Sequence, residues 1–434
     1  MATAARDGGW TLEMTDPANP CSGGNNWKAS TAPNGGTPGR KNANDAVNND
    51  VTGPQLIRAH TTDSLTILLV FDEPLDSLAG ASVSHYTIDG GLTLQQAISL
   101  PPLFNQVQLK LSIPMMLNSI YTITASNITD CTGNLIGVSN SARTGLPLDP
   151  SPGDWVINEI LSDPRSNAFD FVELYNNSKK ILDASRVYIA NRNSSGIISS
   201  ANVLSPLPFY IFPGDHIVVT EDADNLALQY LVKNPGLVLE ISSLPSFPDD
   251  EGTVIVLNFQ GVVTDEVRYK DDWHFKLLVN TEGVSLERID PSGNSQDPVN
   301  WHSAASTAGY GTPTYANSQF RPGKEAQATV EVSPNLFSPD NDGHDDITRL
   351  QYAITEPGYI ANVTIYNVAG RIVRNLVRNG TLGLKGYWNW DGLDDKGVRL
   401  PVGVYILFTE FFNLQGKKEQ FKNTVVLARN LLGR

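Results

Sequence analysis

A short acidic run, Asp340-Asn-Asp-Gly-His-Asp-Asp346, contains the side chains of this sequence best suited to bind a metal ion. Its four aspartates, Asp340, Asp342, Asp345 and Asp346, surround a glycine. Calcium takes about six to eight oxygen ligands, many of them from carboxylates in short loops, and a glycine lets the backbone turn around the ion. The run is shorter than an EF-hand loop and lacks its final glutamate. Two interpretations stay open: a calcium site formed by these four carboxylates, or a turn whose carboxylates accept backbone N–H groups.

Outside this loop, we find no residue pattern typical of an enzyme active site. The six histidines lie far apart in the sequence. The zinc-binding pattern His-Glu-x-x-His and the nucleophile elbow Gly-x-Ser-x-Gly are both absent, as is a phosphate-binding glycine loop. We therefore expect the chain to be non-catalytic, with no cofactor and with calcium as the one candidate ion.

The chain has two cysteines, Cys21 and Cys131. Two are too few for a disulfide-rich scaffold, and their separation is not a metal-ligand spacing. They are either paired across a long stretch or free. In an oxidising compartment, a bridge would tie the N-terminal segment to the domain that ends near Cys131.

Five tryptophans also allow two interpretations. Aromatic rings side by side on a surface can bind sugars, and this would make the protein a carbohydrate-binding module. Tryptophans scattered over sandwich strands are more often anchors of the hydrophobic core. We expect that second role for Trp155, Trp273, Trp301, Trp388 and Trp390.

Short β-strands are the elements that must position these residues. Runs rich in Val, Ile, Tyr and Phe alternate with polar residues and are interrupted by Gly, Asn, Asp and Pro. Clear examples are residues 65–71, 107–111, 121–124, 171–175, 254–257 and 363–366. The one fair candidate for a helix is the segment from Asp222 to Lys233. Because 434 residues are too many for one hydrophobic core, the pattern predicts an all-β protein of tandem immunoglobulin-like β-sandwich domains.

An internal repeat relates the N-terminal segment to residues near position 300. Gly9-Trp-Thr-Leu-Glu-Met-Thr-Asp-Pro17 aligns with Gly283-Val-Ser-Leu-Glu-Arg-Ile-Asp-Pro291 at an offset of 274 residues. The same offset places Asn26-Trp27 on Asn300-Trp301. After a one-residue insertion, Gly36-Thr-Pro38 falls on Gly311-Thr-Pro313 and Asn42 falls on Asn317. A match of this length indicates a duplication.

The two copies differ in what precedes them. About 130 residues precede the second copy inside its domain, and they have no counterpart ahead of the first. An isolated hairpin is marginal in water. We therefore expect residues 1–42 to be a remnant of a domain whose earlier strands are missing, largely irregular and dependent on the next domain for order. In pairs across the repeat, Trp10, Leu12 and Trp27 should be more exposed than Val284, Leu286 and Trp301.

Two strings open the block that ends with the second copy: Trp155-Val-Ile-Asn-Glu-Ile160 and Asp170-Phe-Val-Glu-Leu-Tyr-Asn-Asn177. They resemble the lamin tail domain, an immunoglobulin-like sandwich of nuclear lamins and of many exported bacterial proteins. The resemblance covers residues 153–318. It implies that residues 1–42 are the last strands of a first lamin tail domain. Lamin tail domains also accompany enzymes such as nucleases and phosphoesterases.

The two remaining blocks have resemblances of their own. Residues 43–146, with Asp130-Cys-Thr-Gly-Asn134 near their end, are similar to bacterial Ig-like domains. Residues 326–434 contain Asn335-Leu-Phe-Ser-Pro-Asp-Asn-Asp-Gly343, Trp390-Asp-Gly392 and Leu400-Pro-Val-Gly-Val-Tyr405. This combination resembles the Ig-like domain of flagellar hook-capping proteins and the related C-terminal sorting domains of type IX secretion, a gliding-motility-type machinery. It implies that the last module directs export or surface attachment by binding the secretion machinery.

Charge and hydropathy exclude two classes of partner. A net charge of −15 disfavours nucleic acid and anionic membrane surfaces. No apolar run approaches the ~20 residues of a membrane span. The acidity belongs to the earlier modules, because residues 326–434 contain 12 Lys and Arg against 11 Asp and Glu.

We therefore expect a non-catalytic structural or adhesive multidomain protein of the cell surface or the extracellular space. Its ligand would be a protein or glycan surface, and its last module would serve export or attachment. One alternative is the accessory C-terminal region of a larger extracellular hydrolase, a nuclease or phosphoesterase, whose catalytic domain lies upstream. A second alternative is a carbohydrate-binding module.

Overall fold

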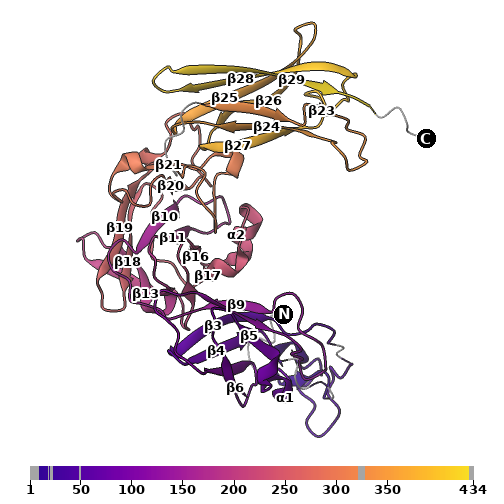
Figure 1. Ribbon diagram of the computed structural model, residues 1–434, viewed down its shortest axis with the longest axis vertical. Coiled ribbons are helices and arrows are strands. Elements are labelled where there is room, and N and C mark those ends of the chain that lie inside the picture. The colour runs from indigo at the N-terminus through magenta and orange to yellow at the C-terminus, as the bar shows by residue number, and fades with distance from the viewer. Residues whose placement is uncertain (1–8, 18, 20–22, 48–49, 321–327, 430–434) are drawn as a thin grey trace. The chain divides into compact units, whose positions relative to one another are not determined.

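A computed structural model describes residues 9–17, 19, 23–47, 50–320 and 328–429 (Figure 1). Almost all regular structure in these residues is β-strand, which confirms the predicted all-β class of tandem sandwiches. The chain forms two compact units. The first contains the chain up to Leu148 with Lys179–Asp183 and Pro208–Phe212, and the second contains Asp149–Ser178, Ala184–Leu207 and Pro213–Arg434. The finer division into four ranges stays a prediction.

The first unit contains a two-sheet sandwich. Its hydrophobic residues alternate with polar ones, so that Val107, Leu109 and Leu111 are buried and the residues between them are partly exposed. The carboxylate of Asp76 caps the short helix α1 (Ser77–Gly80). One sheet has the order β3 (Leu56–Asp63), β4 (Thr66–Phe71), β7 (Gln106–Leu111), β6 (Leu94–Ser99), and the other the order β5 (Tyr86–Ile88), β8 (Tyr121–Ala125), β9 (Ser141–Thr144). The same unit includes the small sheet of β12 (Leu182–Asp183) and β15 (Tyr210–Ile211).

The N-terminal segment forms a hairpin of its own, from β1 (Leu12–Met14) and β2 (Trp27–Ala29). Most of the other described residues up to position 42 lie outside regular elements, as expected, but hydrogen bonds within the segment hold it in place. The physical reason is a buried carboxylate, because Ser30 and Thr37 donate hydrogen bonds to Glu13, which is 3% exposed. The expected exposures are confirmed: Trp10, Leu12 and Trp27 are 37%, 67% and 44% exposed, against 5%, 2% and 2% for Val284, Leu286 and Trp301.

One of the two cysteines lies in this unit at a described position. Cys131 follows the buried Asp130 and is disulfide-bonded. Cys21, the other cysteine of the chain, lies outside the described residues.

The second unit begins with a larger sandwich. Strand β10 (Trp155–Leu161) is buried at every position, as expected of a central strand that is covered on both faces. The six-stranded sheet has the order β17 (Val238–Glu240), β16 (His216–Thr220), β11 (Phe171–Asn176), β10, β20 (Leu286–Arg288), β21 (Trp301–Ser303). The four-stranded sheet has the order β14 (Ile198–Val203), β13 (Val187–Arg192), β18 (Glu251–Asn258), β19 (Val263–Lys270).

Helix α2 (Ala223–Gln229) is shorter than the predicted segment. It begins after Asp222, whose carboxylate accepts the N–H of Asn225. Leu226 and Tyr230 are buried, whereas Leu228 and Leu231 are exposed. Short 3-10 turns connect the strands of both units: η2 (Gly23–Asn26), η3 (Val83–His85), η4 (Ala184–Arg186), η5 (Pro235–Leu237), η6 (Asp271–Trp273), η7 (Pro298–Asn300) and η8 (Ser306–Ala308).

The last module of the second unit has a separate core that includes Phe337, Ile365, Trp390, Leu407 and Phe411. Its three-stranded sheet has the order β22 (Thr329–Ser333), β24 (Thr348–Ala353), β27 (Lys385–Trp390). Its five-stranded sheet has the order β23 (Leu336–Phe337), β29 (Lys418–Leu427), β28 (Gly403–Asn413), β25 (Tyr359–Asn367), β26 (Ile372–Thr381). None of the helices in the described ranges has the length and hydropathy of a membrane-spanning segment.

Candidate functional site

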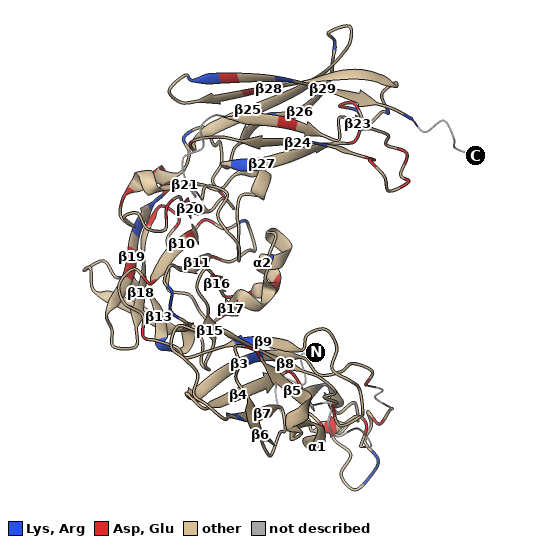
Figure 2. Cartoon of the chain, in the orientation of Figure 1, with Lys and Arg blue, Asp and Glu red and all other residues tan. Residues whose placement is uncertain are grey.

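The predicted calcium ligands lie in the loop between β23 and β24 of the last module, among the acidic positions marked in Figure 2. Carboxylate oxygens of Asp340, Asp342 and Asp346 lie within 4.8 Å of one another. Asp345 does not belong to this group of described residues, and its backbone carbonyl accepts a hydrogen bond from the N–H of Ser338. Three of the four predicted ligands are therefore close enough to share one ion.

The same carboxylates also accept hydrogen bonds from the backbone of the loop. Asp346 accepts from the N–H groups of Asn341 and Gly343, and Asp342 accepts from the N–H of His344 at 2.8 Å. These are the bonds of an Asx-rich turn, which was the second interpretation of the sequence. They use oxygens that a cation would also need, so the calcium site stays a prediction.

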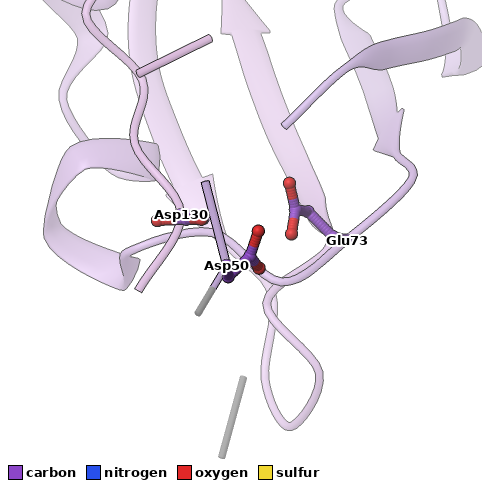
Figure 3. A group of neighbouring side chains, drawn as sticks. All are labelled: Asp50, Glu73 and Asp130. Carbon is purple, nitrogen blue, oxygen red and sulfur yellow. The ribbon is translucent and has the colours of Figure 1, made fainter. Parts of the chain in front are cut away.

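A second acidic group lies in the first unit, and sequence reasoning missed it (Figure 3). Carboxylate oxygens of Asp50, Glu73 and Asp130 lie within 4.8 Å of one another. Asp130 is buried and accepts the N–H groups of Thr132 at 2.9 Å and of Asn134 at 2.8 Å. The string Asp130-Cys-Thr-Gly-Asn134 indicates this turn, but only the fold brings the other two carboxylates to it.

The crowding of negative charge changes the protonation of one member of this group. Burial, followed by the charges of Asp50, Asp130 and Asp72, raises the pKa of Glu73 to about 7. A proton on Glu73 therefore relieves part of the repulsion near neutral pH. Asp130 of this group also organises its own turn, through the N–H groups of Thr132 and Asn134.

Three glutamates lie in the core of the second unit: Glu159 on β10, Glu173 on β11 and Glu287 on β20. Each is 0% exposed. One loop supplies a backbone N–H to each carboxyl group: Thr312 to Glu159 at 2.8 Å, Thr314 to Glu173 at 2.7 Å, and Gln319 to Glu287 at 2.8 Å. We call this group, formed by the carboxyl groups of Glu159, Glu173 and Glu287, the polar centre. It connects three strands to one loop.

Two of these carboxyl groups share one hydroxyl as a hydrogen-bond donor. The hydroxyl oxygen of Thr312 lies 2.8 Å from an oxygen of Glu287 and 3.1 Å from an oxygen of Glu159. A hydroxyl has one hydrogen to donate, so the two carboxyl groups compete for it. Burial raises the pKa of each of the three glutamates, and the neighbouring carboxylates raise those of Glu159 and Glu173 further.

This polar centre anchors the loop inside the core of the second unit. A carboxylic acid with a raised pKa is suited to proton transfer, but only within hydrogen-bond reach of the substrate. The three glutamate side chains are 0% exposed in this structure. The adjacent Arg288 does not neutralise the centre, because it pairs with Asp265 at 3.0 Å.

The five tryptophans have the core role that we expected. Trp155, Trp301 and Trp390 are buried. Trp273 and Trp388 are partly buried, and their rings pack against Trp301 and Tyr352 with centroid distances of 6.3 Å and 4.7 Å. The rings therefore anchor cores and do not form an exposed row.

A hollow of about 850 Å³ lies within the second unit. Its lining includes the rings of Tyr230, Tyr315, Phe320 and Tyr387. The ammonium group of Lys233 lies 3.7 Å from the centroid of the Tyr315 ring. The described residues that line the hollow include no Asp, Glu, His or Cys. Thr312 and Ser318, which bond to the core glutamates, also line it. An aromatic hollow of this kind can hold a small ligand.

The sequence matches no family model. No curated protein matches it either. Among solved structures, the S-layer protein SbsC is 10% identical over 88% of this chain and 55% of that chain, with a TM-score of 0.21. PorU from Porphyromonas gingivalis is 11% identical over 87% of this chain and 34% of its own, with a TM-score of 0.20. PorZ, a surface component of the type IX secretion system of the same bacterium, is 12% identical over 85% of this chain and 43% of its own, with a TM-score of 0.20. The chain thus spans between 34% and 55% of the length of these proteins, and such low TM-scores assign it to no family.

Proposed function

We propose that this chain is a non-catalytic structural or adhesive part of a multidomain bacterial protein that is secreted or held at the cell surface. The observation that carries the proposal is the placement of its acidic groups. The three perturbed glutamates are closed inside a core, and aspartates of the other two carboxylate groups hold turns. The acidic side chains in these groups therefore serve to hold the loops of the sandwich domains in place.

In this proposal, residues 153–318 are a lamin tail domain and residues 43–146 are a bacterial Ig-like spacer. The two strings that carry the first resemblance form β10 and β11, which pair in the middle of the six-stranded sheet. The loop ends of such sandwiches present protein- or glycan-binding surfaces. The hollow next to Tyr315 is the place where a small glycan would be tested first.

The last module, residues 326–434, is proposed to bind the secretion machinery and to direct export or surface attachment. Its separate hydrophobic core supports this role, because a sorting signal of this kind has to fold as a unit. Its near-neutral charge sets it apart from the acidic remainder of the chain.

The experiment is a fusion of residues 326–434 to a periplasmic reporter in a host with type IX secretion. We expect the reporter to reach the medium or the cell surface. A matched fusion of residues 43–146, which form the other small sandwich, should stay in the periplasm. If the first fusion is protease-resistant and still stays in the periplasm, the sorting role is refuted. Purified chain should also leave DNA and phosphoesters uncleaved, and turnover that a single carboxylate substitution abolishes would refute the non-catalytic part.

A further inference from the structure

The two copies of the repeat share a hydrogen-bond network as well as a sequence. In the first copy, Thr37 donates its hydroxyl to Glu13 at 2.6 Å, and the N–H of Asn44 reaches the other carboxylate oxygen at 3.2 Å. In the second copy, Thr312 and the N–H of Gln319 make the equivalent bonds to Glu287, both at 2.8 Å. The strand register is also the same, because Leu12 pairs with Ala29 as Leu286 pairs with Ser303.

Two asparagines extend the equivalence to the loops. Asn42 donates to the carbonyl of Met14 at 2.9 Å, and Asn317 donates to that of Arg288 at 2.8 Å. Asn26 accepts the N–H of Asp16 at 2.8 Å, as Asn300 accepts that of Asp290 at 2.9 Å. The first copy is therefore a complete hairpin-and-loop motif, held in the conformation that the second copy has inside a full sandwich.

In the second copy, this motif receives another strand on its open edge. Strand β10 pairs with β20, which places Glu159 opposite Glu287 and Ile160 opposite Leu286. Asn158 on the same strand exchanges two hydrogen bonds with Asn317, both at 2.8 Å. Strand β11 then pairs with the far edge of β10. Each residue of the string Asn158-Glu159-Ile160 thus has one partner in the motif: Asn317, Glu287 and Leu286, in that order.

In the first copy, no described strand occupies the corresponding edge of β1. On either side of the paired residues, the carbonyl of Thr11 accepts the N–H of Ser30 at 2.8 Å, and the N–H of Thr15 donates to the carbonyl of Asn26 at 2.7 Å. Since backbone groups alternate in direction along a strand, the N–H and C=O of Leu12 point away from β2. The Leu12 side chain is 67% exposed, whereas Leu286 is 2% exposed next to β10. The edge has the geometry of an acceptor for β-strand addition.

We propose that β1 accepts an added strand pair of the β10–β11 kind. The first added strand contains an Asn-Glu-Ile string that pairs with β1, so that its isoleucine lies opposite Leu12 and its glutamate lies opposite Glu13. Its asparagine bonds to Asn42, as Asn158 bonds to Asn317. A purely apolar strand would leave the amide of Asn42 without this partner. The proposal is independent of the function proposed above.

The experiment uses the full chain and a fluorescent peptide of residues 153–178, which contains both strands of the pair. We expect the anisotropy of the peptide to rise on binding. Leu12→Lys should weaken binding at least tenfold, because lysine on an edge opposes strand addition. The matched control is Val138→Lys in the same unit, because Val138 is 98% exposed and lies outside the hairpin. A peptide with Asn158→Ala and Glu159→Leu should bind at least tenfold more weakly than the native peptide.

A second measurement covers the case in which the free peptide does not adopt the paired form. The same peptide is fused through a Gly-Ser linker to the N-terminus of the full chain, which raises its effective concentration. Amide exchange at Leu12 should then slow at least tenfold relative to the fusion that contains the altered peptide. Equal binding by the two lysine variants overturns the proposal. Unprotected Leu12 in the native fusion overturns it as well.

Discussion

Substitution of Glu287 by glutamine should stabilise the second unit at neutral and higher pH. One oxygen of Glu287 accepts from Ser318 and Gln319, and the other lies 2.8 Å from the hydroxyl of Thr312. A glutamine carbonyl can take the first position, and its amide can donate to Thr312 in the second. The threonine hydrogen is then free to bond to Glu159 at all pH values. The polar centre keeps every hydrogen bond and loses one potential charge.

The sign of the pH dependence follows from the direction of the pKa shift. Burial raises the pKa of Glu287, so the folded state binds more protons than the unfolded state above the ordinary glutamate pKa of 4.5. The free energy of unfolding of the wild type therefore falls as pH rises through that window. Each proton of difference between the folded and unfolded states changes this free energy by about 1.4 kcal/mol per pH unit. Glu287→Gln removes one such proton, so the gap between variant and wild type should open across this range.

The assay is urea unfolding followed by tryptophan fluorescence at several pH values from 4.5 to 8. The two proteins should agree near pH 4.5, and the variant should be more stable by about 1–3 kcal/mol at pH 7.5. The matched control is Glu13→Gln, in which hydrogen bonds from Thr37 and Ser30 lower the pKa of the carboxyl group. All its oxygens accept bonds, so an amide there loses acceptors and the first unit should become less stable. A Glu287→Gln variant that is less stable than wild type at pH 7.5 would show that Glu287 is ionised and needed as an anion.

Three further outcomes are expected. Calcium should raise the melting temperature of the wild type by a few degrees relative to chelator. It should not do so for Asp342→Asn. Equal melting temperatures of the wild type in calcium and in chelator would refute the calcium site and leave the Asx-rich turn as the role of these aspartates. Glu73→Gln should remove a loss of stability that the wild type shows as pH rises from about 4.5 to about 7, and a wild type whose thermal melts do not change over this window contradicts the raised pKa. Trp301→Ala should cost about 3–5 kcal/mol in urea unfolding, whereas the repeat-related Trp27→Ala should cost less than about 1 kcal/mol because Trp27 is 44% exposed; similar losses at the two positions would contradict the assigned burial.

Much of the architecture could be predicted from the sequence because its patterns are local. Alternating residues such as Val107 and Leu109 predict a half-buried strand without any knowledge of its neighbours. The repeat offset of 274 residues gives the register of the second hairpin from that of the first, because Leu12 and Leu286 occupy the same ladder position. The exposure of Leu12 followed from the same comparison.

The acidic sites could be predicted only in part, for a physical reason. Asp340, Asp342 and Asp346 are close in sequence, so their proximity follows from one turn. The group of Asp50, Glu73 and Asp130 and the three core glutamates come from separate segments, which only long-range strand pairing brings together. Within a strand, a glutamate such as Glu173 is normally assigned to the solvent face. Nothing local in the sequence indicates that a loop more than a hundred residues away supplies its N–H donor.

The duplicated motif places two equivalent carboxyl groups, those of Glu13 and Glu287, in different surroundings. Glu13 and Glu287 accept equivalent bonds from a threonine and a backbone amide, yet the pKa of Glu13 is lowered and that of Glu287 is raised. The bonds themselves favour the anion, since donors stabilise negative charge. The additional factor at Glu287 is burial by the sandwich around it, which includes β10 and β11. Covering this motif is therefore coupled to proton uptake, and the same coupling should accompany any strand pair that adds to β1, because the incoming glutamate and Glu13 would share a closed core.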